Sequence, residues 1–500
     1  MTDSWANTTP GEEPGEARDT PGDHIPGDHT PDHRTPPDHR TVLGTDLHLE
    51  LRGPGLRTGL MDALREAVRT GRLAPGIRLP SSRSLAADLG IARNTVADAY
   101  AELVAEGWLT AQQGSGTRVA RRAAPRTPAP AAPRTRPAHR RATYSLMPGA
   151  PDLAGFPRAQ WLRAARRALT DAPHEAFGYG DPAGLAELRT VLADYLARAR
   201  GVYAAPERIV ICSGFFHGLT LLGTVLRARR VRAVAVESYG LRQHRKVLTD
   251  AGLRTPALPL DGYGTRTGEL AGVRGAGAVL LTPAHQFPTG VALHPDRRAA
   301  AVDWARATDG LILEDDYDGE FRYDRQPVGA LQGLDPERVV YLGTASKSLA
   351  PGLRLGWMVL PEGLVAEVTA AKGEVDWASS ALDQLTLAEF IASGAYDRHV
   401  RFMRLRYRRR RDQLVEALAG RPDIRVTGIA AGLHAVVELP AGTERSVIEA
   451  AAWQGLAVSG LARFRHETAE PGPDALVVGY GTPPVSAWAG ALDALCRALP

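Results

Sequence analysis

Long apolar runs and cysteines are both scarce in this sequence. No apolar stretch approaches the roughly 20 residues that a membrane-spanning helix needs, and the first residues lack the basic region and the apolar core of a signal peptide. The two cysteines, Cys212 and Cys496, lie far apart and indicate neither a disulfide framework nor a thiolate metal site. We therefore expect a cytoplasmic protein with reduced cysteines and no bound metal.

Lysine is scarce as well. Lysine and arginine together number 60, but Lys246, Lys347 and Lys372 are the only lysines. A reaction that requires a lysine amine therefore has three candidates. The formal net charge of +4 is too small to indicate nucleic-acid binding by the chain as a whole, so the placement of charge matters more than its sum.

Composition divides the 500 residues into four segments. Residues 1–42 are Pro/Asp/His-rich with little to bury, which predicts a disordered tail. Residues 43–120 form a first globular domain, residues 121–143 a stiff Pro/Ala/Arg linker, and residues 144–500 a second domain. The linker arginines could contact DNA phosphates or only keep the linker soluble. We interpret the tail as solvated, although four of its side chains could bind a metal transiently: His24, His29, His33 and His39.

Short apolar runs alternate with amphipathic helices after residue 144. This alternation predicts an α/β fold with a mainly parallel sheet covered by helices. The runs are RIVIC, AVAVE, AVLLTP, LILEDD and VVYLG.

The first domain has the pattern of a winged helix-turn-helix. Apolar spacing predicts a helix over 60–70, a second helix from the capping pair Ser81/Ser82 to Gly90, and a third over 93–107. Two short helices joined by a glycine turn make a helix-turn-helix, and residues 108–120 read as a hairpin wing. A small helical domain that binds no DNA is the alternative. The polar residues at the start of the third helix favour DNA, because side chains there meet base edges.

The segments LPSSRSLAADLGIARNTVADAYAELVAEGWLT and QQGSGTRV resemble the GntR family of regulators. This resemblance implies binding to double-stranded operator DNA. It implies that Gly114 reaches the minor groove from the wing. The other DNA contacts that it implies are Arg83, Arg93, Asn94 and Thr95.

Pyridoxal phosphate chemistry requires a lysine amine, a carboxylate for the pyridine nitrogen and a phosphate cradle. Lys246 in RQHRKVL and Lys372 in AAKGEVD read as solvated surface. Lys347 differs, since it follows an apolar strand in GTASKSLAPGLRLGW, with hydroxyls, glycines and Arg354 around it. Lys347 is therefore the candidate anchor.

The second domain resembles the fold-type I aminotransferases, with a smaller C-terminal α+β subdomain. The two domains together resemble the MocR subfamily of GntR regulators. The resemblance implies that pyridoxal 5'-phosphate is the cofactor and that Lys347 is its Schiff-base lysine. Asp315 would pair with the pyridine nitrogen and Tyr317 with the ring hydroxyl, in the motif LILEDDYDGEFRY.

The same resemblance assigns the phosphate site. Thr344 and Arg354 would bind the phosphate, and Ser213 and Gly214 would present backbone amides to it at a helix N-terminus. Tyr179 resembles the tyrosine that reaches the phosphate of the partner subunit. This implies a homodimer.

The sequence also departs from the aminotransferase pattern. Phe287 stands where these enzymes carry an asparagine before Pro-Thr-Gly, and the ring-stacking position is left open between Leu241 and Tyr239. The arginine that grips a substrate carboxylate is missing from DALVVGYGTPP, and Arg463 is the nearest substitute. Without that fork of donors an amino acid would be poorly oriented for proton removal, so we do not expect aminotransferase turnover.

Three functions compete at this point. The preferred hypothesis is a DNA-binding transcription regulator that uses pyridoxal phosphate, or an amine or amino acid reacting with it, as its effector. The second is an active aminotransferase with a DNA-binding appendage. The third is a repressor in which the aminotransferase-like domain only provides a dimerisation scaffold.

Overall fold

The computed structural model describes residues 49, 51, 55–112, 116–121, 142–323 and 329–500. The chain divides into two compact units, Met1–Thr135 and Arg136–Pro500. The predicted tail, nearly all of the predicted linker and Gly114 lie outside the described residues. No helix in the described ranges combines the length and the apolar composition of a membrane span.

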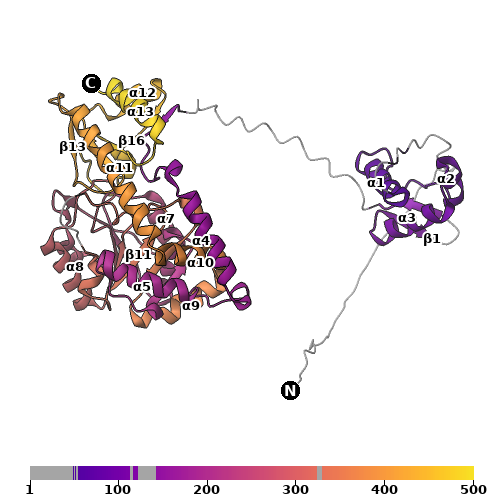
Figure 1. Ribbon diagram of the computed structural model, residues 1–500, viewed down its shortest axis with the longest axis horizontal. Coiled ribbons are helices and arrows are strands. Elements are labelled where there is room, and N and C mark those ends of the chain that lie inside the picture. The colour runs from indigo at the N-terminus through magenta and orange to yellow at the C-terminus, as the bar shows by residue number, and fades with distance from the viewer. Residues whose placement is uncertain (1–48, 50, 52–54, 113–115, 122–141, 324–328) are drawn as a thin grey trace, which may run out of the picture. The chain divides into compact units, whose positions relative to one another are not determined.

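The described residues of the first unit form three helices and a two-stranded antiparallel hairpin (Figure 1). Its core is formed by apolar residues at helical spacing, among them Leu60, Leu64, Val96 and Leu103. The first helix begins at Leu56, earlier than the apolar spacing predicts. The elements are α1 (Leu56–Arg69), α2 (Ser82–Leu89), α3 (Arg93–Ala105), β1 (Leu109–Gln112) and β2 (Gly116–Val119).

The second unit is built on a seven-stranded sheet. The five apolar runs of the sequence form β4, β5, β9, β10 and β11. Neighbouring strands are parallel, except that β12 pairs antiparallel with both β4 and β11. In spatial order the strands are β4 (Ile209–Cys212), β12 (Gly356–Val359), β11 (Val339–Thr344), β10 (Leu311–Asp315), β9 (Ala276–Leu281), β5 (Ala233–Glu237) and β6 (Ala257–Leu258).

Helices cover both faces of this sheet. Successive residues of a strand point to opposite faces, so Ile209 and Ile211 of β4 join one core cluster and Val210 and Cys212 join another. The first cluster includes residues of α4 (Arg158–Asp171), α5 (Ala186–Arg200) and α10 (Ala381–Ala392). The second includes residues of α6 (Phe215–Ala228), α7 (Arg242–Asp250) and α9 (Glu362–Val375). A third, over β9 and β10, includes residues of α8 (Pro295–Thr308).

A smaller C-terminal subdomain completes the second unit. Its antiparallel sheet has the order β13-β14-β17-β16. Helix α11 connects it to the large sheet, because Tyr396 and Val400 pack in the large-sheet core while Leu414 and Leu418 pack in the subdomain core (Figure 1). The elements are α11 (Ala395–Leu418), β13 (Arg425–Thr427), β14 (Ala435–Glu438), α12 (Glu444–Trp453), β16 (Ser459–Gly460), β17 (Ala475–Val478) and α13 (Val485–Ala498), with β3 (Tyr144–Ser145) pairing with β15 (Leu456–Ala457) beside them.

Candidate functional site

Local hydrogen bonds define the helix-turn-helix. The hydroxyl of Ser81 accepts from the amide of Ser84 at 3.1 Å and caps α2. Gly90 ends α2 in the left-handed conformation, with φ of 66°. The hydroxyl of Tyr100 on α3 donates to the carbonyl oxygen of Pro80 at 3.1 Å, which ties α3 to the start of α2.

The residues predicted to contact DNA lie at the starts of these two helices. Arg93, Asn94 and Thr95 form the first turn of α3, where Arg93 and Asn94 are exposed and Thr95 is partly buried. Arg83 is exposed in the first turn of α2. Gly114 lies outside the described residues. The first turn of α3 therefore presents its polar side chains to solvent, as a recognition helix requires.

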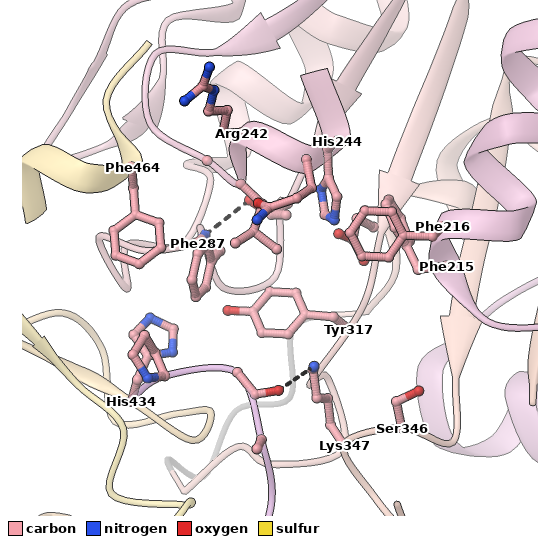
Figure 2. Close-up of a pocket in the computed structure, with 18 of the residues that line it drawn as sticks. Phe215, Phe216, Arg242, His244, Phe287, Tyr317, Ser346, Lys347, His434 and Phe464 are labelled. Carbon is pink, nitrogen blue, oxygen red and sulfur yellow. Dashed lines mark hydrogen bonds between the residues drawn. The ribbon is translucent and has the colours of Figure 1, made fainter. Parts of the chain in front are cut away.

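A cavity of about 1020 Å³ lies at the carboxyl ends of β10 and β11 in the second unit. Five of the predicted cofactor residues line it: Asp315, Tyr317, Thr344, Lys347 and Arg354. Figure 2 shows Lys347 and Tyr317 near its centre, with Phe215, Phe216 and His244 on one side and Phe287 and Phe464 on the other. Ligand sites in open α/β sheets lie at this end of the strands.

Lys347 differs from the other two lysines in its surroundings. Its Nζ is 2.6 Å from the carbonyl oxygen of Gly149. Burial lowers the pKa of the Lys347 amine, and the charges of Asp315 and Asp318 oppose that shift. Lys246 is exposed on α7 and pairs with Asp250 at 2.7 Å, as the sequence predicts.

The prediction that Lys372 is solvated surface is wrong. Its side chain is fully buried on α9, and Nζ donates to Asp376 at 3.0 Å and to the carbonyl oxygen of Trp377 at 3.3 Å. The apolar stem packs inside while the amine reaches polar atoms at the end of the helix. Lys372 does not line the cavity.

Asp315 ends β10 with its side chain buried against the cavity. Its Oδ1 has no hydrogen-bond partner in the part of the chain that the structure describes. Burial raises the pKa of Asp315 well above its usual range, although the charge of Lys347 opposes that shift. The neighbouring Asp316 points elsewhere and forms a buried ion pair with Arg200 at 2.6 Å. Asp315 therefore keeps an acceptor atom available for a hydrogen-bond donor in the cavity.

The predicted phosphate end is built around Arg354 and the start of α6. Arg354 has a left-handed backbone, with φ of 52°, and its guanidinium donates to the carbonyl oxygen of Ser213. Gly214 precedes α6 with φ of 89°, and a Cβ there would lie 3.2 Å from the guanidinium of Arg354. The absence of a side chain therefore lets the guanidinium approach the helix N-terminus, where anions bind.

Two predicted phosphate contacts are arranged differently from expectation. The amide of Ser213 donates to Nδ1 of His217 at 3.0 Å, so this amide already has a partner. Ser213 and Gly214 are not among the described residues that line the cavity, whereas Phe215 and Phe216 are. The hydroxyl of Thr344 bonds to that of Ser346 at 2.8 Å. Ser346 also lines the cavity. It is not among the site residues predicted from the sequence, although it directly precedes Lys347.

Both candidates for the ring-stacking position line the cavity, and a third residue joins them. Tyr239 is buried with Phe287 and Phe464, and Leu241 packs against the same cluster. His244 lies against Phe215, with ring centroids 4.5 Å apart. Burial lowers the pKa of His244 to about 3, so its ring is neutral. No sequence pattern indicates a role for His244, because only folding brings α7 to the cavity.

The remaining predicted residues lie at the surface. Tyr179 is 96% exposed and contacts Trp377 with ring centroids 6.4 Å apart. It is not among the described residues that line the cavity of its own chain. Arg463 is exposed at the cavity rim together with Arg242.

Two protein families match this chain. Residues 56–119 match the family described as bacterial regulatory proteins, gntR family, and residues 149–469 match aminotransferase class I and II, a family that depends on pyridoxal phosphate. An archaeal alanine:glyoxylate aminotransferase of known structure is 26% identical with a TM-score of 0.64, over 71% of this chain and 90% of that one.

Curated relatives carry both domains. The HTH-type pyridoxine biosynthesis transcriptional regulator PdxR of Corynebacterium glutamicum is 34% identical over 438 residues, 85% of this chain and 92% of that protein. The probable rhizopine catabolism regulatory protein MocR of Rhizobium meliloti is 32% identical over 448 residues, 84% of this chain and 89% of that protein. These relatives support a regulator over an aminotransferase with an appendage. The chain therefore belongs to the MocR subfamily of GntR-type transcription regulators, with a helix-turn-helix domain joined to an aminotransferase-like domain.

Proposed function

We propose that this regulator binds pyridoxal phosphate through Lys347, and that the cofactor, or an amine or amino acid reacting with it, is the signal to which DNA binding responds. One observation carries the proposal: Asp315 at the end of β10 lines one cavity together with Lys347 and Arg354, which lie in the connection between β11 and β12. Lys246 and Lys372 are paired with Asp250 and Asp376 outside it.

The chemistry of the cavity fits this cofactor at both ends. The unpartnered Oδ1 of Asp315 can accept from a protonated pyridine nitrogen, and a cation there would stabilise the ionised carboxylate that burial now disfavours. Arg354 and the N-terminal turn of α6 supply positive charge and amide donors for a phosphate.

When bound, pyridoxal phosphate supplies an aldehyde that bonds covalently to an amine. The residues of this chain prepare that amine. Burial lowers the pKa of Lys347, which raises the fraction of neutral, nucleophilic amine. The carbonyl oxygen of Gly149 holds Nζ in place at 2.6 Å.

The DNA side of the proposal rests on the first unit. Arg93, Asn94 and Thr95 would meet base edges or phosphates from α3, and Arg83 would meet a phosphate from α2. Gly114 would enter the minor groove from the wing. A protein that binds a double-stranded operator would act in the cytoplasm. The linker over 121–143 would join the DNA-reading domain of 43–120 to the effector domain of 144–500.

The regulator would act as a homodimer. Tyr179 is almost fully exposed and is not among the described lining residues of its own cavity, which suits a residue that completes the phosphate site of a partner subunit. Each site would then depend on both subunits. Binding of the effector could thereby change the relation between the two DNA-reading domains.

Cofactor titration tests the proposal directly. Protein stripped of cofactor and titrated with pyridoxal phosphate should gain a visible absorbance that borohydride removes, and its operator affinity should change over the same concentrations. Absence of the absorbance would contradict the cofactor assignment. A chromophore without any change in operator affinity would contradict the effector role, and release of a keto acid from amino donors would favour a working aminotransferase.

A further inference from the structure

A buried hydrogen-bond chain lies behind Tyr317. The hydroxyl of Tyr317 donates to the carbonyl oxygen of His285 at 3.1 Å and lies 3.0 Å from Nδ1 of the same residue. That Nδ1 lies 2.8 Å from Oδ2 of Asp318. The side chains of His285 and Asp318 are only 3% and 2% exposed. Two contacts to one residue therefore fix the position of the phenol oxygen.

The surrounding contacts identify the tautomer of His285. A carboxylate accepts hydrogen bonds, so Nδ1 carries the proton that faces Asp318. The Nε2 atom is buried and has no hydrogen-bond partner among the described residues. The ring of His434 lies beside it, with centroids 4.9 Å apart, and burial holds the pKa of His434 at about 3. This neighbour is neutral and donates from Nε2 to the carbonyl oxygen of Pro288 at 3.0 Å.

Tyr317 remains a hydrogen-bond donor in this environment. Burial raises the pKa of its hydroxyl well above the usual range, and the charges of Asp318 and Asp315 add to the shift. The charge of Tyr480 acts in the same direction, and Lys347 lies beside the ring of Tyr317 (Figure 2). The phenol therefore carries a proton that it can donate either to the carbonyl oxygen of His285 or to a ligand in the cavity.

We propose that His285, held by Asp318, is a positioning residue that aims the hydroxyl of Tyr317 at the ring hydroxyl of the cofactor, and so sets the pH at which the bound chromophore changes protonation. The inference rests on the proposed cofactor. Phe287 occupies the place of the asparagine that bonds this ring oxygen in aminotransferases, and its side chain offers no donor. The His285–Asp318 pair compensates by fixing the donor that remains.

The same side chains suggest a second reading, a metal site. One ligand atom from each of His285, Asp318 and His434 lies within 4.8 Å of the others. The Nδ1 atom of His285 and Oδ2 of Asp318 already contact each other at 2.8 Å, and Nε2 of His434 is bonded to a carbonyl oxygen. We therefore favour the hydrogen-bond chain, and metal content becomes an outcome of the test.

The experiment is a pH titration of the visible absorbance of cofactor-loaded protein. A donor stabilises a negatively charged ring oxygen, so loss of the positioned phenol should move the midpoint upward by about one pH unit. The amide of His285→Asn reaches the position of Nδ1, whereas the same amide in His285→Gln extends one carbon further. His285→Asn should titrate like wild type, and His285→Gln should be shifted.

Additional variants separate positioning from general damage. Tyr317→Phe should show the same upward shift, and His285→Gln combined with Tyr317→Phe should add nothing further, because both act through one hydroxyl. His466→Gln is the matched control, since His466 is 3% exposed with an unpartnered Nε2 but is not among the described residues bonded to Tyr317.

The outcomes distinguish this inference from the proposed function. Wild-type protein without a chromophore would overturn the cofactor assignment itself. A normal chromophore with equal midpoints in wild type, His285→Asn and His285→Gln would overturn only the role of His285. A stoichiometric metal ion in purified wild type that is lost in His434→Gln would also overturn it, in favour of the metal site.

Discussion

The amine of Lys347 lies 2.6 Å from the carbonyl oxygen of Gly149, which belongs to the segment where the second unit begins. The hydroxyl of Thr482 donates to the carbonyl oxygens of Met147 at 2.6 Å and of Ala150 at 3.1 Å. These contacts hold the segment from the side of the C-terminal subdomain. The candidate cofactor lysine thus contacts the chain close to where it follows the predicted linker. A covalent bond at Nζ would therefore alter the hydrogen bond that Lys347 donates to the carbonyl oxygen of Gly149.

Replacement of Lys347 by alanine should abolish the borohydride-reducible visible absorbance while the protein stays folded. The other two lysines are held by Asp250 and Asp376 outside the cavity. Absorbance spectra with circular dichroism as the folding check would measure this. Lys246→Ala is the matched control and should keep the chromophore. A reducible chromophore in Lys347→Ala would mean that another amine is the anchor.

Arg93→Ala should weaken binding to the specific operator by roughly 1 to 3 kcal/mol, as expected for loss of a base or phosphate contact. Arg93 is exposed in the first turn of α3. Fluorescence anisotropy at fixed salt would measure the affinity, and the cofactor spectrum should not change. Arg57→Ala, on α1 where Arg57 pairs with Glu102 at 3.6 Å, is the control. Equal operator affinities for wild type, Arg93→Ala and Arg57→Ala would show that Arg93 on α3 does not contact the operator.

The operator should contain two half-sites separated by whole helical turns of about 10 base pairs, because a dimer presents two recognition helices. A polyproline-like linker reaches about 3.1 Å per residue, so spacings larger than a compact dimer allows could also be bound. Insertion of half a turn between the half-sites should reduce affinity more than insertion of a full turn. Equal losses for both insertions would mean that the two domains bind independently.

Arg200→Met should destabilise the second unit by about 3 to 5 kcal/mol, the usual cost of leaving a buried charge unpaired. The side chains of Arg200 and Asp316 are 3% and 1% exposed, and the hydroxyl of Tyr341 also donates to Asp316 at 2.7 Å. Urea unfolding followed by circular dichroism would report the loss. The double variant Arg200→Met, Asp316→Leu removes both charges and should recover part of the lost free energy of unfolding. A double variant less stable than Arg200→Met alone would contradict the cost assigned to the unpaired charge.

The free energy of unfolding should fall as pH rises from about 4.5 to about 7, in part because of Glu320. Burial, with the charge of Asp316, raises the pKa of Glu320 from 4.5 to about 7. Over that window the folded state keeps a proton that the unfolded chain has lost, so this stability is present at low pH and is lost as pH rises. Glu320→Gln cannot ionise and should remove on the order of 3 kcal/mol of that fall. Identical pH profiles for the two proteins would contradict the raised pKa.

Interactions between residues close together in the chain explain why parts of the DNA-binding site and of the cofactor site can be predicted from the sequence. The cap at Ser81, the left-handed Gly90 and the apolar spacing of α3 are determined by neighbouring residues, so the helix-turn-helix can be read from the chain. Lys347 was identified in the same way, because a strand and small polar residues flank it. Lys372 departs from the prediction, since AAKGEVD has the pattern of solvated surface and only the packing of α9 buries the side chain.

The sequence by itself determined the two-domain organisation, the strand runs and the candidate anchor Lys347, because periodicity, caps and motif order act over short stretches of chain. Only the tertiary structure decided that His285 meets Asp318 behind Tyr317, that the amide of Ser213 is bonded to His217, and that Asp315 keeps an unpartnered oxygen. These relationships depend on which side chains converge when distant segments pack and exclude water. The spacing of residues along a chain does not specify hydrogen-bond partners of that kind.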